Sequence, residues 1–241
     1  MPAPSVHVTI RRIAEFDQHD WTEILDFGSR FFEGAFTESI QAKQDLVLMR
    51  GDDGRLLGIG ALEMFELTYA NRTVTVIHAG NAAFADETRG QGHVQRIGFR
   101  YFLRAKRLRP WRPVYLAYTT FSWRTYLMLT RNFVRSWPRR NVTLPVWEAG
   151  LYEQLGRRLL DERYDPTAGV GRNLDRRLRP DIAAIPTHLA ADPDLRYFVA
   201  RNAGYASGDV LLCLAPLTLA NWWSIARRMM RRRRRPSESN G

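Results

Sequence analysis

The chain has 241 residues, 45% of them hydrophobic, and a formal net charge of +11, and this length supports a hydrophobic core without covalent staples. The single cysteine, Cys213, excludes an internal disulfide, and its apolar surroundings predict a buried, inert thiol. The first residues hold no apolar segment of signal-peptide length, and the longest apolar stretch, 210–223, is shorter than the roughly 20 residues of a membrane-spanning helix. We therefore predict a cytoplasmic protein.

Hydrophobic periodicity predicts the order of helices and strands. Period-two or β-branched segments predict strands at 6–13, 45–50, 56–69, 73–84, 114–119 and 210–214. Helical periodicity predicts helices at 21–36, 39–44, 94–108, 122–129, 147–162 and 194–204. Strands alternate with helices after an antiparallel hairpin. The predicted fold class is therefore a mixed α/β fold with a mainly antiparallel central sheet flanked by helices.

The C-terminal part differs in composition. We predict a single domain over 1–218 with a Pro- and Arg-rich insertion at about 137–190, a basic amphipathic helix over 219–235 and a disordered tail over 236–241. On a helix, one arc of about 120° collects the apolar side chains Leu219, Trp222, Trp223, Ala226, Met229 and Met230.

Tryptophans beside a run of arginines are typical of a helix lying in an anionic membrane surface, and the adjacent pair Trp222 and Trp223 makes this our preferred interpretation. The alternatives are docking on the protein's own core, an acidic partner such as an acyl carrier protein, and nonspecific nucleic-acid binding. No segment resembles a sequence-specific nucleic-acid module.

Residues 86–98, DETRGQGHVQRIG, join a predicted strand to the clearest predicted helix. A tight loop before a helix exposes unpaired backbone N–H groups at the positive end of the helix dipole, so such a loop can hold a phosphate. The segment is not a Walker loop, because it lacks Gly-Lys-Ser/Thr, and it is not a dinucleotide fingerprint, because Gln95 stands where the third glycine belongs. An ordinary Gly-rich turn is the alternative.

The loop resembles the acyl-coenzyme A loop of the GNAT superfamily of acyltransferases, whose pattern is Arg/Gln-x-x-Gly-x-Gly/Ala before a helix. Arg89 and Gly92 match it, Gly90 agrees with the frequent Arg-Gly-x-Gly-x-Gly form, and Val94 stands where Gly or Ala is usual. By element order the resemblance covers 6–133. It implies a GNAT-like fold that binds an acyl-thioester donor, either acyl-coenzyme A or an acyl carrier protein. The implied donor-binding residues are Ala82, Phe84, Arg89, Gly90, Gln91, Gly92, His93 and Val94.

The resemblance also implies a general base and a tyrosine that protonates the leaving thiolate. Tyr126 is the candidate acid, about two residues farther from Phe133 than the family's Tyr-x-x-x-Gly-Phe, and a core aromatic is the alternative. His78 on the central strand is the candidate base, since a neutral imidazole suits the task. Glu63 and Glu66 on the neighbouring strand are the other candidates.

The predicted function is acyl transfer to an amine or hydroxyl of a small-molecule or lipid-like acceptor, at the inner face of a membrane to which the protein attaches peripherally. The alternative is a non-catalytic GNAT-like binding or scaffold module that the basic helix anchors to the membrane. The five histidines show no spacing typical of metal ligands, so we predict no metal site.

Overall fold

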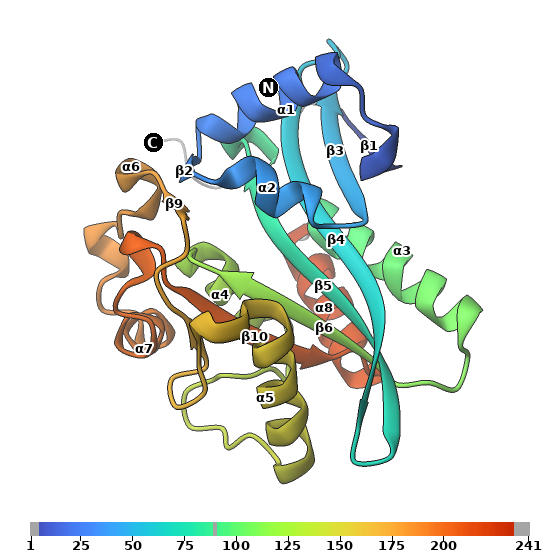
Figure 1. The fold of residues 1–241 in the computed structure, drawn as a ribbon, viewed down its shortest axis with the longest axis vertical. Helices are drawn as coiled ribbons and strands as arrows, with labels where there is room; N and C mark the ends of the chain where they lie inside the picture. Colours follow the sequence, from blue (N-terminus) through green and yellow to red (C-terminus); the bar gives the residue numbers. More distant parts are fainter. Residues whose placement is uncertain (1–4, 89–90, 234–241) are drawn as a thin grey trace.

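Helices cover both faces of a mixed eight-stranded sheet in the computed structural model, which describes residues 5–88 and 91–233 (Figure 1). The strand order is β1-β3-β4-β5-β6-β10-β8-β7, and within it β5 and β6 are parallel while the other pairs are antiparallel. The predicted fold class is therefore confirmed. The strands are β1 (Val6–Arg12), β2 (Phe32–Gly34), β3 (Asp45–Gly51), β4 (Leu56–Tyr69), β5 (Arg72–Phe84), β6 (Val114–Thr120), β7 (Tyr164–Asp165), β8 (Val170–Gly171), β9 (Arg176–Leu178) and β10 (Val210–Pro216).

Two apolar cores, one on each face of the sheet, hold the helices in place. One core receives side chains from α1, α2 and α5, and the other receives them from α3, α4, α7 and α8. The α-helices are α1 (Gln18–Ser29), α2 (Phe36–Gln41), α3 (His93–Leu108), α4 (Trp123–Asn132), α5 (Val146–Leu160), α6 (Pro180–Ala183), α7 (Pro193–Arg201) and α8 (Leu219–Arg233). We call the two sides of the sheet the α1–α2 face and the α3–α4 face.

The predicted helix at 21–36 is wrong at both ends. Asp17 forms a capping box with Asp20 and starts α1 three residues earlier, at Gln18. The helix ends at Ser29, and β2 follows because it pairs with β9, more than 140 residues farther along the chain. Such a distant partner leaves no periodic signal in the local sequence.

The segment from 137 to 190 contributes strands to both sheets. β7 and β8 extend the main sheet beyond β10, and β9 pairs with β2 in a second, two-stranded sheet. α5 packs against the sheet on the α1–α2 face. The proposed domain limits stay predictions, and the tail proposed at 236–241 lies outside the described residues.

Helix α8 divides the apolar arc predicted for it. Trp222, Ile225 and Met229 pack into the core of the α3–α4 face. Leu219, Trp223 and Met230 are exposed by 87%, 66% and 47%. One side of α8 thus docks on the protein, and a second apolar side remains open to solvent.

Candidate active site

The two parallel strands at the centre of the sheet separate at their carboxyl ends. Their pairing stops at Ala79↔Tyr118, although β5 runs on to Phe84 and β6 to Thr120. Beyond Ala79, the edge of β5 that faced β6 therefore has no strand partner among residues 5–88 and 91–233.

A bulge lies in β5 at the point of separation. The register of β4 against β5 shifts between Ile59 and Ala61. On β5, Asn81 lies in the shifted stretch and has φ of +51°, in the left-handed region that a non-glycine residue rarely adopts. Such strain, held in place by the surrounding structure, is common at binding sites.

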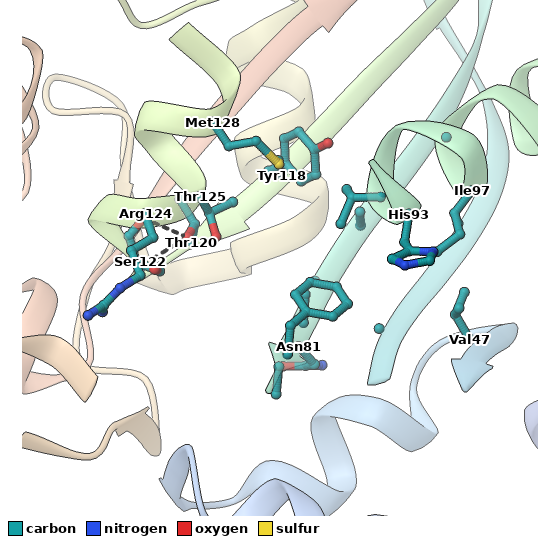
Figure 2. A pocket seen from close by; sticks show the side chains of 18 of the residues that line it. Val47, Asn81, His93, Ile97, Tyr118, Thr120, Ser122, Arg124, Thr125 and Met128 are labelled. Atoms are coloured by element: carbon teal, nitrogen blue, oxygen red, sulfur yellow. Dashed lines mark hydrogen bonds between the residues drawn. The ribbon is translucent and has the colours of Figure 1, made fainter. Parts of the chain in front are cut away.

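A cavity of about 530 Å³ occupies the gap between the separated strands and continues between α3 and α4. Figure 2 shows Tyr118 and Met128 on one side of it, His93 and Ile97 on the other, and Asn81 below them. Most of its lining is apolar, with a few polar groups among the apolar side chains, as in many ligand sites.

The N-terminus of α3 opens into this cavity. Gly92 is the N-cap with φ of +78°, a conformation that favours glycine, and among the described residues no side chain caps the first turn. Gly92, His93 and Val94 all line the cavity. The first backbone N–H groups of α3 thus lie at the cavity wall and can receive an anion.

A buried carboxylate fixes the position of α3 against the sheet. Asp45 on β3 is 2% exposed and accepts hydrogen bonds from Tyr101 and Arg104 of α3, both at 2.9 Å. Burial, together with the hydrogen bond to Asp45, raises the pKa of Tyr101. The N-terminus of the helix is therefore held rigidly beside β5.

Five of the residues predicted to bind the donor line the cavity, namely Ala82, Phe84, Gly92, His93 and Val94. Gln91 does not line it, because its side chain donates to the carbonyl of Glu87 and contacts the His93 ring. Arg89 and Gly90 lie outside the described residues.

A buried polar cluster lies on the α1–α2 face of the sheet at the same gap. His78 is 2% exposed; its Nδ1 is 2.8 Å from Glu63 Oε1 and 3.0 Å from Lys43 Nζ. Its Nε2 is 3.2 Å from Thr119 Oγ1. Lys43 also forms an ion pair with Glu63. His78 does not line the cavity, whereas Thr119 does.

The charges within this cluster follow from burial and pairing. Burial lowers the pKa of His78 to about 4, against the opposing effect of Glu63, so the imidazole is neutral at pH 7. Burial tends to raise the pKa of Glu63, but hydrogen bonds from His78 and Lys43 lower it to about 2. Burial also lowers the pKa of Lys43. At neutral pH the cluster therefore contains a carboxylate, an ammonium and a neutral imidazole.

Asn81 lines the cavity and has a buried acceptor in its side chain. It is 7% exposed, and its Nδ2 donates to the carbonyl of Ser39 on α2 at 3.0 Å. Its Oδ1 has no hydrogen-bond partner within the part of the chain that the structure describes. A buried oxygen of this kind is costly to leave unpaired, so it suits a ligand that brings an N–H or O–H.

Tyr126, the predicted acid, is fully buried and does not line the cavity. Its ring packs against Tyr197 and Phe198 of α7, and its role in catalysis stays a prediction. Tyr118 does line the cavity, and burial raises its pKa, which keeps its hydroxyl protonated. Tyr118 and Thr119 were not among the predicted site residues. Both lie at the carboxyl end of β6, next to the central strand β5, and that position could have indicated that they border a site.

The alternative base Glu66 lies away from the cavity. It forms surface ion pairs with Arg109 and Arg112, near the start of β5. Cys213 is 1% exposed on β10, and burial raises the pKa of its thiol.

No group of three or more histidine, cysteine, aspartate or glutamate side chains that could hold a metal ion occurs in residues 5–88 and 91–233. Within the same described residues, none of the helices has the length and apolarity needed to cross a membrane.

No protein-family model matches the chain, and no curated protein matches it. Similar solved structures include an acyl-CoA N-acyltransferase from Pseudomonas aeruginosa, 19% identical, covering 47% of this chain and 79% of that chain at a TM-score of 0.35. Another is the GNAT family N-acetyltransferase YhbS from Escherichia coli in complex with CoA, 13% identical over 53% and 67% of the two chains at 0.36. A third is Saccharomyces cerevisiae N-myristoyltransferase with bound myristoyl-CoA, 7% identical over 47% and 31% at 0.33. At these scores the similarities carry no argument about activity.

The chain's own architecture agrees with the expectation from its loop. Antiparallel strands surround one parallel pair, the pair separates at its carboxyl ends, and the connection between its strands is a loop followed by the long helix α3. The chain has a GNAT-like fold.

Proposed function

We propose that the protein is an acyltransferase that moves an acyl group from an acyl-thioester to an amine or hydroxyl acceptor. The observation that carries this proposal is a single cavity bordered by three features. These are the N-terminus of α3, the unpaired edge of β5 and, through Thr119, the buried cluster around His78. An anion site, a polar backbone edge and a proton acceptor are what thioester acyl transfer requires.

The donor phosphates would bind at the N-terminus of α3. Gly92 leaves the first backbone N–H groups accessible, and Arg131 and Arg228 also line the cavity. The Arg228 guanidinium donates to the backbone carbonyl of Arg131 at 2.9 Å, and the Arg131 guanidinium forms an ion pair with Asp192. The pantetheine arm would follow the edge of β5 near Ala82 and Phe84, as the resemblance implies.

The acyl group would occupy the apolar part of the cavity. Val47, Met49, Leu62 and Ile97 form a wall beneath the first turns of α3, and this wall offers no polar partner to a headgroup. Burying each methylene of an acyl chain there stabilises binding by about 0.8 kcal/mol. The proposed donor is therefore a thioester whose acyl chain is longer than acetyl.

The open side of α8 supports the proposed membrane attachment. Its exposed apolar side chains lie beside Arg227 and Arg231, which are also exposed. Trp222 packs against Phe99 of α3 at 5.0 Å between ring centroids, and Phe99 is itself 44% exposed. The apolar surface of α8 thus continues onto α3. Apolar side chains ringed by arginine suit the interface of an anionic bilayer.

Thermal stability in the presence of coenzyme A and of acetyl-, octanoyl- and palmitoyl-coenzyme A tests the donor site. A ligand at 100 times its Kd stabilises the folded state by about 2.7 kcal/mol, which raises Tm by about 5 to 10 °C for a chain of this size. We expect Val94→Asp to abolish this shift, because a carboxylate in the first turn of α3 repels phosphate. The same carboxylate favours the helix dipole, so the fold should persist.

Val94→Thr is the matched control, since it keeps the shape and adds no charge, and it should retain the shift. If no acyl-thioester, coenzyme- or carrier-bound, stabilises the wild-type protein, the proposed function is wrong. If Val94→Asp keeps the ligand-induced rise in Tm, the phosphate site does not lie at the N-terminus of α3.

A further inference from the structure

We propose that Thr119 is a catalytic residue that carries the proton of the acceptor from the cavity to His78. This inference rests on the proposed function and deepens it, because it assigns the path by which a buried histidine serves as the base. The His78 ring does not line the cavity, so a direct contact between imidazole and acceptor is not available. Thr119 lines the cavity, and its Oγ1 lies 3.2 Å from Nε2 of the imidazole.

The backbone places Thr119 at the reacting end of the cavity. Thr119 directly follows Tyr118, the last β6 residue paired with β5, so its side chain stands where the strands begin to separate. Its Oγ1 is 3.7 Å from where a side chain on Gly80 would begin, so the glycine leaves room at the hydroxyl. The next residue, Asn81, also lines the cavity, and its buried Oδ1 has no hydrogen-bond partner among the described residues.

The hydrogen bonds around His78 select one tautomer. Glu63 is a carboxylate and can only accept, so at 2.8 Å it requires a proton on Nδ1. Lys43 Nζ lies 3.0 Å from the same Nδ1, and a hydrogen bond donated there would place the ring proton on Nε2 instead. We assign the Lys43 protons to the Glu63 carboxylate, with which Lys43 forms an ion pair. Nε2 is then left with a lone pair 3.2 Å from the Thr119 hydroxyl, which donates to it.

With an amine acceptor, two proton transfers accompany formation of the new bond. The acceptor nitrogen forms a bond to the thioester carbonyl carbon and gives its proton to Thr119 Oγ1, while the hydroxyl proton passes to His78 Nε2. His78 becomes an imidazolium that Glu63 stabilises. Breaking the carbon–sulfur bond yields the amide and a thiolate, which takes the proton of the Tyr118 hydroxyl. The proton on His78 then returns through Thr119 to the Tyr118 phenolate, so both residues regain their starting states.

Two groups besides Glu63 act on His78 by charge. Lys43 beside Nδ1 and Arg176 on β9 both disfavour the imidazolium. Replacing Lys43 by methionine should therefore make His78 more basic. The low-pH limb of kcat would then move to higher pH in Lys43→Met, an effect that a merely structural role for the cluster would not produce.

Thr119→Val tests the relay, because valine has the same shape and no hydroxyl. We expect kcat to fall by about 100-fold or more, in the range of general-base catalysis, while coenzyme A still raises Tm. Thr119→Ser should restore most of the rate. Thr75→Val is the matched control, since Thr75 is 5% exposed on the same strand as His78 and lies outside the cavity. Rates are measured as release of coenzyme A from octanoyl-coenzyme A with small primary amines and alcohols.

A second measurement needs no acceptor. Nitrogen-15 NMR of labelled histidine, assigned with His78→Gln, should show a protonated Nδ1 and a bare Nε2, and Thr119→Val should move mainly the Nε2 signal. A proton on Nε2 would overturn the relay.

Two other results would also overturn the relay. One is a kcat for Thr119→Val within about threefold of wild type, well short of a general-base effect. The other is a covalent acyl adduct on Thr119, which would make the residue a nucleophile. Failure of the proposed function looks different, because the wild-type protein would then neither bind coenzyme A nor release it.

Discussion

Tyr118 and Thr119 are neighbours in the sequence but serve opposite faces of the sheet. Tyr118 packs with the core of the α3–α4 face, where the lining is apolar and the N-terminus of α3 supplies backbone N–H groups. Thr119 contacts His78 on the α1–α2 face, where charged side chains satisfy one another. Strand alternation thus lets one strand border the proposed donor site with one side chain and the proposed proton path with the next.

The two faces of the sheet bury different kinds of side chain. Apart from Asp45 beneath α3, the α3–α4 face lines the cavity mainly with apolar side chains and with the backbone at the start of α3. The α1–α2 face buries ionisable groups that need partners. The first should respond to changes in shape, and the second to pH and to the loss of a single partner. Acidification and the replacement of single side chains should therefore affect the two faces differently.

The largest expected effect is a pH-dependent stability on the α1–α2 face. The pKa of folded His78, about 4, lies below the ordinary value of 6.5, so the unfolded chain binds more protons between these limits. The contribution of neutral His78 is complete above pH 6.5 and is lost as the pH falls towards 4. Urea unfolding of wild type and His78→Gln should show their difference shrinking by up to about 3 kcal/mol across this window.

Lys43→Met sharpens this test. Replacing Lys43 removes a positive charge that lowers the pKa of His78. The loss of stability on acidification should therefore be smaller in this variant than in wild type. Parallel pH curves for wild type and His78→Gln would show that His78 does not titrate in the way that its burial requires.

The next effect concerns the two tyrosines. We expect Tyr118→Phe to lower kcat by about 10- to 100-fold, because it removes the hydroxyl that can protonate the leaving thiolate at the cavity wall. Tyr126→Phe should leave kcat almost unchanged and cost little stability, because the Tyr126 hydroxyl is buried without a hydrogen-bond partner among the described residues. Steady-state kinetics of both variants test this. A large fall of kcat in Tyr126→Phe with little change in Tyr118→Phe would make Tyr126 the acid.

The smallest effect separates the two sides of α8. Trp222→Ala should lower the free energy of unfolding by about 2 kcal/mol, because Trp222 packs on Phe99 and Phe102. Trp223→Ala should change it by less than about 0.5 kcal/mol, because Trp223 is 66% exposed. The same Trp223 variant should weaken sedimentation with vesicles of phosphatidylcholine and phosphatidylglycerol, measured at low and high salt. Equal sedimentation of wild type and variant would contradict membrane attachment through this side of α8.

Local patterns predicted the elements whose partners are near in sequence. The hairpin of β3 and β4, the helix behind Gly92 and the strand at Val210–Pro216 follow from periodicity and turn chemistry. β2 and β9 did not follow, because each is three residues long and exists only through pairing with the other. The arc on α8 was predicted whole, but the fold divides it, since α3 covers Trp222 and leaves Trp223 open.

The sequence by itself determined a glycine at the N-cap of a long amphipathic helix, because a left-handed φ and helical periodicity are local properties of the chain. It also predicted His78 on the central strand and Glu63 on the neighbouring one, whereas the pairing of these two residues came from the tertiary structure. Only the tertiary structure decided which tyrosine borders the cavity and which group reaches His78. Both depend on the point at which β5 and β6 separate and on the face of the sheet to which each side chain then points. The pairing register of two parallel strands joined through a long helix fixes that point, and the local sequence does not contain it.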